Sequence, residues 1–247
     1  MALGSKHIVS MCFLWVVLCS DAAFAAENKL LISRFKNADG DKVVSYVLEQ
    51  IYKQVGYEIA FVDYPGKKSV EKANAGETDG ENMRRAGLER IYPNLIQLSQ
   101  PHVDINFRIY IKGNNVFLPE TDSWKKTKIG IVKGVIVSEE MTKDLNTVAY
   151  DSVGELFEEL NLGQIDVAIA TDLIGGLEVF LHHQGEQIQT HGAILKTISL
   201  YHYLHKRHEA LVPLLNKEIA RLRKHGGLKK LYVEGFQVLR SKTKTSD

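Results

Sequence analysis

The alternation of hydrophobic and polar residues along this chain of 247 residues predicts alternating strands and helices. A short apolar run at 29–33 is typical of a buried strand, and apolar residues then recur at helical spacing over 43–52. Alternation over 57–62 predicts a second strand, and 67–75 a second, shorter helix. The order strand, helix, strand, helix favours a parallel sheet with helices on its faces.

A second α/β pattern follows, and two long alternating stretches lie on either side of it. Strands are predicted at 128–132, 147–150 and 165–170, with helices over 138–145, from Asp151-Ser152 to 160, and from Thr171-Asp172 onward. The two stretches, 103–111 and 198–204, read as strands that cross between two units of structure. A further strand over 187–195 is expected to break at Gly192, and helices are predicted at 211–222 and 228–232.

These elements predict an α/β protein of two lobes joined by two hinge crossings. Lobe 1 is expected to be discontinuous, comprising 26–110 and 199–238, while lobe 2 comprises 111–198. The last residues, 239–247, are rich in Lys, Thr and Ser and are expected to form a disordered tail.

Residues 1–25 have the composition of a secretory signal peptide. Basic residues precede an apolar run at 8–18, and Ala23-Phe24-Ala25 supplies the small-x-small site, so cleavage is expected after Ala25. The apolar run is short for a membrane span. A lipid-modified Cys19 is the alternative. The sequence therefore predicts an exported, periplasmic protein of a bacterium with two membranes.

Composition narrows the classes of partner and cofactor. Cys12 and Cys19 both lie in the signal segment, so the mature chain is expected to be stabilised by its core without disulfides. Lysines and arginines number 31 against 30 acidic residues, a balance that argues against nucleic acid binding. His202, His205 and His208 suggest a metal site, but residues six apart do not share a helix face. No cofactor or metal is expected, and the protein is expected to be monomeric.

The stretch 76–93 carries the densest functional chemistry of the chain. Gly76 and Gly80 predict turns, because glycine adopts positive φ without steric cost. The charged residues that follow are Asp79, Glu81, Arg84 and Arg85. Arginine can grip a carboxylate with two parallel hydrogen bonds. Arg84 is therefore either a ligand anchor or a structural ion-pair partner of Glu81 or Glu89, and Arg85 is more consistent with a solvated or structural residue.

A second candidate wall lies in lobe 2, at the end of the buried strand 165–170. Ligands of such two-lobed proteins bind between the lobes, near strand ends and helix N-termini. Arg84 and Asp172 would face each other across this cleft, as a zwitterion requires, although Asp172 could instead cap a helix. Tyr64, in the turn after the second strand, could stack on a ligand or simply pack.

Three motifs carry a resemblance to a known family: 76–80 (Gly-Glu-Thr-Asp-Gly), 162–168 with the following Asp172, and Gly226-Gly227. With these motifs the chain, from 29 to about 231, resembles the family 3 extracellular solute-binding proteins of polar amino acid ABC transport. The resemblance implies that Arg84 holds a ligand carboxylate and Asp172 an ammonium group. The segment before Arg84 is shorter than in the family, and Gly134 is followed by Val135 and Ile136, features that indicate a divergent branch.

The expected function is a non-catalytic periplasmic binding protein that captures a small polar ligand for an ABC permease. The candidate ligand-binding residues are Arg84, Asp172, Glu81, Tyr64 and Arg85. One alternative is a ligand-sensing protein that signals to a membrane kinase or cyclase. Another is a dehydratase-like enzyme, with Glu81 as general base.

Overall fold

The computed structural model describes residues 29–35, 39–65, 67–113, 123–183 and 185–243. The predicted signal peptide and the lipidation alternative at Cys19 lie outside the described residues. Within the described part of the chain, none of the helices combines the length and the apolar character that a membrane span requires.

The described residues form one nine-stranded sheet, in the order β2-β1-β3-β9-β5-β8-β6-β7, with β4 beside β9. The strands are β1 (Lys29–Phe35), β2 (Glu58–Tyr64), β3 (Gly80–Arg84), β4 (Leu95–Gln97), β5 (Val103–Lys112), β6 (Ile129–Val132), β7 (Thr147–Tyr150), β8 (Val167–Thr171) and β9 (Ile188–His205). Strands β1, β2 and β3 pair in parallel, as do β6, β7 and β8. Each parallel group is the centre of one lobe.

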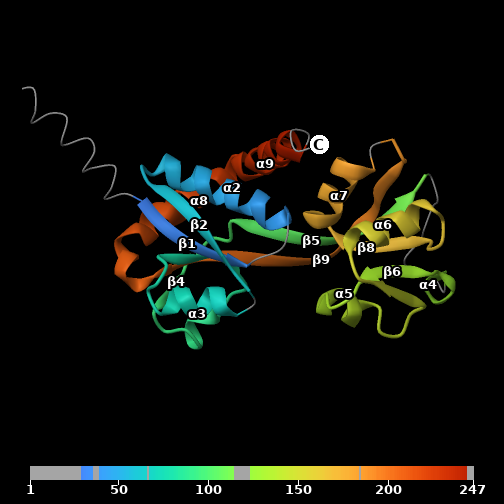
Figure 1. Ribbon diagram of the computed structural model, residues 1–247, viewed down its shortest axis with the longest axis horizontal. Coiled ribbons are helices and arrows are strands. Elements are labelled where there is room, and N and C mark those ends of the chain that lie inside the picture. Colours follow the sequence, from blue (N-terminus) through green and yellow to red (C-terminus); the bar gives the residue numbers. More distant parts are fainter. Residues whose placement is uncertain (1–28, 36–38, 66, 114–122, 184, 244–247) are drawn as a thin grey trace, which may run out of the picture.

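The two long strands β5 and β9 join the lobes. They pair antiparallel from Val103 opposite Leu200 to Lys112 opposite Ile188, and Figure 1 shows them running side by side between the lobes. The predicted two-lobed α/β fold with two crossings is confirmed. The predicted lobe boundaries fall within or next to these two strands and stay a prediction.

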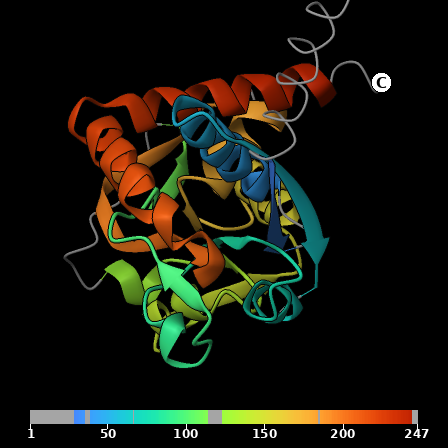
Figure 2. The same cartoon turned by 90° about the vertical axis from the view of Figure 1, so that its left-hand side faces the viewer.

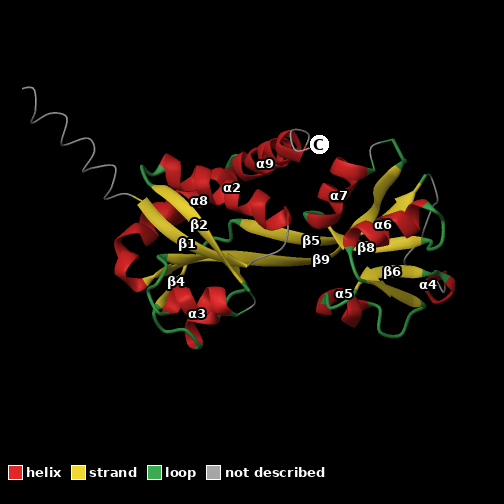
Figure 3. Cartoon of the chain, viewed as in Figure 1, coloured by secondary structure: helices red, strands yellow, loops and turns green. Residues whose placement is uncertain are grey.

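Helices cover both faces of the sheet in each lobe (Figure 3). They are α2 (Asp39–Gln54), α3 (Lys68–Asn74), α4 (Ser123–Lys126), α5 (Ile136–Met141), α6 (Val153–Asn161), α7 (Ile174–His182), α8 (Val212–Lys224) and α9 (Gly227–Thr243), with 3₁₀ segments η1 (Leu88–Arg90) and η2 (Lys206–Leu211). In lobe 1, α2, α8 and α9 lie on one face of the sheet and α3 on the other, as the end-on view in Figure 2 shows.

The prediction of a strand break at Gly192 is wrong. β9 is a single strand of 18 residues, and Gly192 has a φ of 69° at a shift in the pairing register opposite Phe107–Ile109. The glycine marks a bulge. Pairing with β5 on both sides of the bulge keeps the strand continuous.

The predicted short helix at 228–232 and the disordered tail from 239 are also wrong for the described residues. α9 has 17 residues and ends at Thr243, because apolar residues continue at helical spacing through Phe236 and the buried Leu239. Residues 244–247 lie outside the described part.

An apolar cluster spans the two lobes on the face that carries α2 and α9. Val43 and Val44 of α2 and Leu239 of α9 pack with Leu173 and Leu177 at α7 of lobe 2. The rings of Phe180 and Phe236 add a contact between α7 and α9, with centroids 6.4 Å apart. These contacts hold the lobes together on one side of the crossing strands. We call this set the interlobe cluster.

Candidate functional site

Strand β3 forms the polar wall of lobe 1. The predicted turn at Gly80 is wrong, because Gly80 begins β3 and does not adopt positive φ. A Cβ at Gly80 would lie 2.4 Å from the carbonyl oxygen of Tyr203, so glycine is required by the close approach of β9. The predicted turn at Gly76 is confirmed by its φ of 75°.

Arg84, at the end of β3, is paired with Glu81 of the same strand. Its Nη2 lies 2.8 Å from Glu81 Oε1 and 2.5 Å from Ser69 Oγ. The Glu81 side chain is fully buried, whereas that of Arg84 is 23% exposed. The ion pair raised as an alternative from the sequence is therefore present. The Arg84 guanidinium already holds a carboxyl group of its own chain.

Glu81 sits where it can hold a proton. Burial raises its pKa to about 7, against the lowering effects of Arg84 and of the hydroxyls of Ser33 and Ser69. Ser33 Oγ lies 2.6 Å from Glu81 Oε2 and 2.9 Å from the carbonyl oxygen of Gly80. That carbonyl can only accept, and a hydroxyl has one proton. When Ser33 donates to Gly80, its contact with Glu81 requires a proton on the carboxyl group.

A buried polar chain runs inward from Glu81. Its backbone carbonyl lies 2.8 Å from His202 Nδ1, and His202 Nε2 lies 2.7 Å from the Tyr52 hydroxyl. Burial lowers the pKa of His202 to about 4, so the ring is neutral at physiological pH. A neutral ring that donates from Nδ1 and accepts at Nε2 satisfies both contacts. His202 is therefore a structural residue of the core.

Asp41, in the first turn of α2, is a site residue that the sequence did not single out. Asp41 is only 8% exposed. Its Oδ2 atom is buried without a hydrogen-bond partner among the described residues. Burial raises the pKa of Asp41 to about 6, against the lowering effects of Arg84 and Arg34. Asn82 of β3 also has a buried, unpartnered Oδ1. In the sequence, Asp41 reads only as a helix start, which hides this role.

The lobe 2 wall contains a cavity of about 410 Å³. It lies at the carboxyl ends of β6, β7 and β8, and the residues that line it include Val135, Asp151, Ser152, Thr171 and, from lobe 1, Gly40. Ser152 Oγ caps α6 by accepting from the Glu155 amide at 3.1 Å, as predicted. The presence of Gly40 brings the first turn of α2 to the edge of this cavity.

Asp172 is engaged elsewhere. Its carboxylate accepts from the backbone amide of Asn106 at 3.0 Å and from the side-chain amide of the same residue at 2.7 Å. The N-cap residue of α7 is Leu173, and Thr171 Oγ1 accepts from the Ile174 amide at the start of this helix, so Asp172 does not cap it. Asp172 lines a second cavity, of about 540 Å³, beside Tyr232 of α9. Arg84 lines neither of these two cavities.

Tyr64 and Arg85 occupy the same edge of lobe 1. Tyr64 is the last residue of β2 and is partly exposed. Arg85 follows β3, has an exposed side chain, and accepts a hydrogen bond from the Tyr203 hydroxyl through its carbonyl oxygen. Their proposed contacts with a ligand stay predictions.

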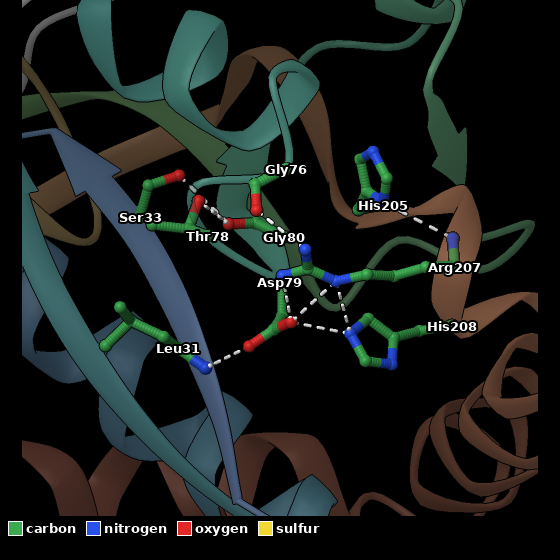
Figure 4. A network of polar contacts seen from close by, with 9 residues as sticks. All are labelled: Leu31, Ser33, Gly76, Thr78, Asp79, Gly80, His205, Arg207 and His208. Carbon is green, nitrogen blue, oxygen red and sulfur yellow. Dashed lines mark hydrogen bonds and ion pairs between the residues drawn. The ribbon is translucent and has the colours of Figure 1, made fainter.

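Asp79 lies just before β3, at the end of the strand away from Arg84, and ties three segments together (Figure 4). Its carboxylate accepts from the Leu31 amide at 2.7 Å, from Arg207 Nε at 3.0 Å and from His208 Nε2 at 2.6 Å. Burial acts to raise the pKa of Asp79, but these hydrogen bonds hold it below its usual value. The described residues include no group of three or more side chains suited to bind a metal ion. The 76–80 motif thus has a structural role here.

We expect Asp79→Asn to lower the free energy of unfolding at pH 7 by about 1.5–3 kcal/mol, the range for a hydrogen bond to a charged group. Because the folded-state pKa is lowered, the loss should shrink as the pH falls below about 4. Urea titration at pH 7 and pH 3.5 measures both values. The control is Glu77→Gln, which removes an exposed pair with Lys72 and should cost less than about 1 kcal/mol. Equal losses in the two variants would contradict the structural role.

Two α/β lobes, two crossing strands and a crevice at facing strand ends define the two-lobed periplasmic binding protein fold. No protein-family model matches the chain. An uncharacterized protein of Shewanella oneidensis is 23% identical over 180 residues, which cover 70% of this chain and 68% of that protein.

Several solved structures share the fold. The second substrate-binding domain of a Streptococcus pneumoniae protein assigned to amino acid ABC transport has a TM-score of 0.65 at 15% identity, covering 84% of this chain and 99% of that one. The VFT2 domain of Bordetella pertussis BvgS scores 0.60 at 14% identity (87% and 97%). The S. pneumoniae substrate-binding protein AbpA, solved with L-arginine, scores 0.55 at 18% identity (88% and 98%).

Proposed function

We propose that the protein is a non-catalytic periplasmic solute-binding protein, a divergent relative of the family 3 group. It encloses a small polar ligand, an amino acid or a related amine or carboxylate, between its lobes. The ligand is then delivered to an ABC permease. The observation that carries this proposal is the pairing of a polar lobe 1 wall, with Asp41, Glu81 and Arg84, and a lobe 2 cavity at the facing strand ends.

The geometry supports binding through charged groups that the fold holds in fixed positions. Arg84 is oriented by Glu81 and Ser69, and Asp41 is held in the first turn of a 16-residue helix. Side chains that are already held in place lose less conformational entropy when a ligand binds. A ligand that contacts both lobes favours the closed arrangement, because those contacts cannot all form when the lobes are open. The solved structures that share the fold include substrate-binding proteins of amino acid transport.

A sensing role is the second candidate. One structure that shares the fold is the VFT2 domain of BvgS. In addition, Arg84 is occupied by Glu81, which departs from a site that awaits a ligand carboxylate. In this role the same closure would be reported to a membrane kinase or cyclase. The dehydratase alternative finds less support, since Glu81 is fully buried and held by two serine hydroxyls and Arg84.

A thermal-shift screen of the mature protein tests the proposal. The panel comprises amino acids, amines, small carboxylates and sugars. A compound that binds only the folded state stabilises it by about 2.7 kcal/mol at one hundred times its Kd. We expect at least one compound to raise the melting temperature. Flat responses across the panel would contradict the proposal, and turnover of a bound compound, followed by mass spectrometry, would favour an enzyme.

Arg84→Ala should weaken binding of that compound at least tenfold, about 1.4 kcal/mol. The variant removes the guanidinium and leaves Glu81 without its partner, so the lobe 1 wall loses its organisation. The matched control is Arg90→Ala, which removes an exposed guanidinium six residues further along the chain and should leave the Kd within about threefold. Isothermal titration calorimetry measures both. Equal losses would place the anchor elsewhere.

A further inference from the structure

The lobe 1 wall contains buried oxygen atoms that accept no hydrogen bond. Asp41 Oδ2 and Asn82 Oδ1 are both buried without a partner among the described residues. The two residues are 8% and 1% exposed. A buried acceptor without a donor costs free energy, so such groups in native proteins call for an explanation. A bound ligand that donates hydrogen bonds is one.

The two acceptor residues are connected through Ser45 of α2. The side-chain amide of Asn82 donates to Ser45 Oγ at 3.2 Å. Ser45 is four residues after Asp41 on α2, so both lie on the same face of the helix. The residue before Asp41, Gly40, lines the lobe 2 cavity, and a Cβ there would meet the side chain of Leu173 at 3.3 Å. Asp41 therefore directly follows the lobe 1 residue that lines the lobe 2 cavity.

The two arginines nearest to Asp41 are paired with other carboxyl groups, so Asp41 has no ion-pair partner of its own among the described residues of this wall. Arg34 pairs with Asp63, with Nε 2.5 Å from Oδ1, and Arg84 pairs with Glu81 at 2.8 Å. Each of these arginines thus has a carboxyl partner of its own. The charges of Arg34 and Arg84 act to lower the pKa of Asp41, but neither arginine donates a hydrogen bond to Oδ2. A protonated amine, which carries only donors, fits this position.

The same wall is poorly suited to a ligand carboxylate. Glu81 already occupies Arg84, and the Ser69 hydroxyl is shared between the two side chains. A ligand carboxylate would have to displace a fully buried carboxyl group from its partners. The displaced Glu81 side chain would lose its contacts with Arg84 and with the hydroxyls of Ser33 and Ser69. Glu81 therefore stands where an amino acid would place its own carboxylate.

We infer that the ligand is a protonated amine without a neighbouring carboxylate, and that its ammonium group binds Asp41 Oδ2 and Asn82 Oδ1 on the lobe 1 wall. This rests on the proposed function and specifies its ligand class. In this arrangement Asp41 supplies the counter-charge, while Glu81 and Arg84 form a closed pair beside it. The lobe 2 cavity receives the remainder of the amine, since its lining includes the apolar Phe107, Val135 and Ile169.

Matched pairs of amines and their parent amino acids test the ligand class on the unaltered protein. The probes are cadaverine and lysine, putrescine and ornithine, agmatine and arginine, histamine and histidine, and tyramine and tyrosine. The members of a pair differ only in the carboxylate. Isothermal titration calorimetry should give an amine as the tightest binder, at least tenfold tighter than its parent amino acid. Tighter binding of the parents, or of carboxylates alone, would overturn the inference and leave the proposed function standing, whereas no binding of any compound would count against both.

Asp41→Asn tests the residue. It keeps the shape of the side chain and removes its charge, so the fold should be retained while the amine Kd rises at least tenfold. Asn82→Ala should weaken the same amine several-fold, as a second variant with an independent effect on folding. The control is Glu58→Gln. It removes an exposed carboxyl group at the first residue of β2 and should change the Kd less than threefold. Unchanged binding in Asp41→Asn, with the fold intact by circular dichroism, would overturn the assignment.

Discussion

Glu81→Gln is expected to make the protein more stable than the unaltered chain at pH 8 by about 3 kcal/mol, and to leave its stability nearly unchanged at pH 4.5. The reason is the folded-state pKa of about 7, which burial raises from 4.5. Each pKa unit corresponds to about 1.4 kcal/mol, so this displacement amounts to about 3 kcal/mol. Glutamine resembles the protonated form and does not ionise.

The sign follows from proton binding. Between pH 4.5 and about 7, the folded state holds more protons at Glu81 than the unfolded chain does. The contribution of Glu81 to stability therefore falls as the pH rises through this window. His202, whose pKa burial lowers to about 4, contributes in the opposite direction, since its share of the stability is lost as the pH falls below about 6.5. Comparing the Gln variant with the unaltered protein isolates Glu81 from this opposing term.

Guanidinium titrations at several pH values between 4.5 and 8 measure the difference between the two proteins. Glu71→Gln is the control, because this residue has an exposed side chain on α3 and should show no pH-dependent difference. A Gln variant that is less stable than the unaltered protein at pH 8 would mean that the ion pair with Arg84 outweighs burial, and would refute a raised pKa for Glu81.

Leu177→Ala is expected to lower the free energy of unfolding by about 2–5 kcal/mol and to shift the protein toward an open arrangement of its lobes. Leu177 is 4% exposed and packs in the interlobe cluster with α2 and α9. Truncating a buried leucine loses its transfer free energy and leaves a cavity. Because the contacts of this cluster are made between lobes, part of the loss favours opening over unfolding.

Small-angle scattering of the ligand-free protein tests the opening, with an increase in the radius of gyration as the expected result. Leu160→Ala is the matched control, since Leu160 is 1% exposed and packs within the core of lobe 2 alone. It should lower the stability by a similar amount and leave the radius of gyration unchanged. The same radius in both variants would show that the interlobe cluster does not hold the lobes closed.

Several features of the fold could be predicted from local patterns. The strand at 165–170 and the helix capped by Ser152 follow from apolar periodicity and a cap residue, both of which act over a few neighbouring positions. The crossings at 103–111 and 198–204 stand out because they are long and alternating. By contrast, the continuity of β9 through Gly192 depends on pairing with β5, which no local signal at the glycine conveys.

The candidate site was predicted only in part. The sequence left open a structural ion pair of Arg84 with Glu81 or Glu89, and the pair with Glu81 is present in the structure. The engagement of Asp172 by Asn106 joins residues 66 positions apart, and the contact of Ser45 on α2 with Asn82 on β3 joins residues 37 positions apart. Sequence spacing carries no information on such contacts.

The amino-acid sequence by itself determined the class of fold, since the period of its apolar residues dictates which face of each strand and helix must be buried. It also determined which charged residues were available near the strand ends. Only the tertiary structure decided which of those charges have partners. Whether a charged group has a partner depends on which groups folding brings within hydrogen-bond distance of it. Ser33 beside Glu81 and the unpartnered Asp41 are both products of that packing.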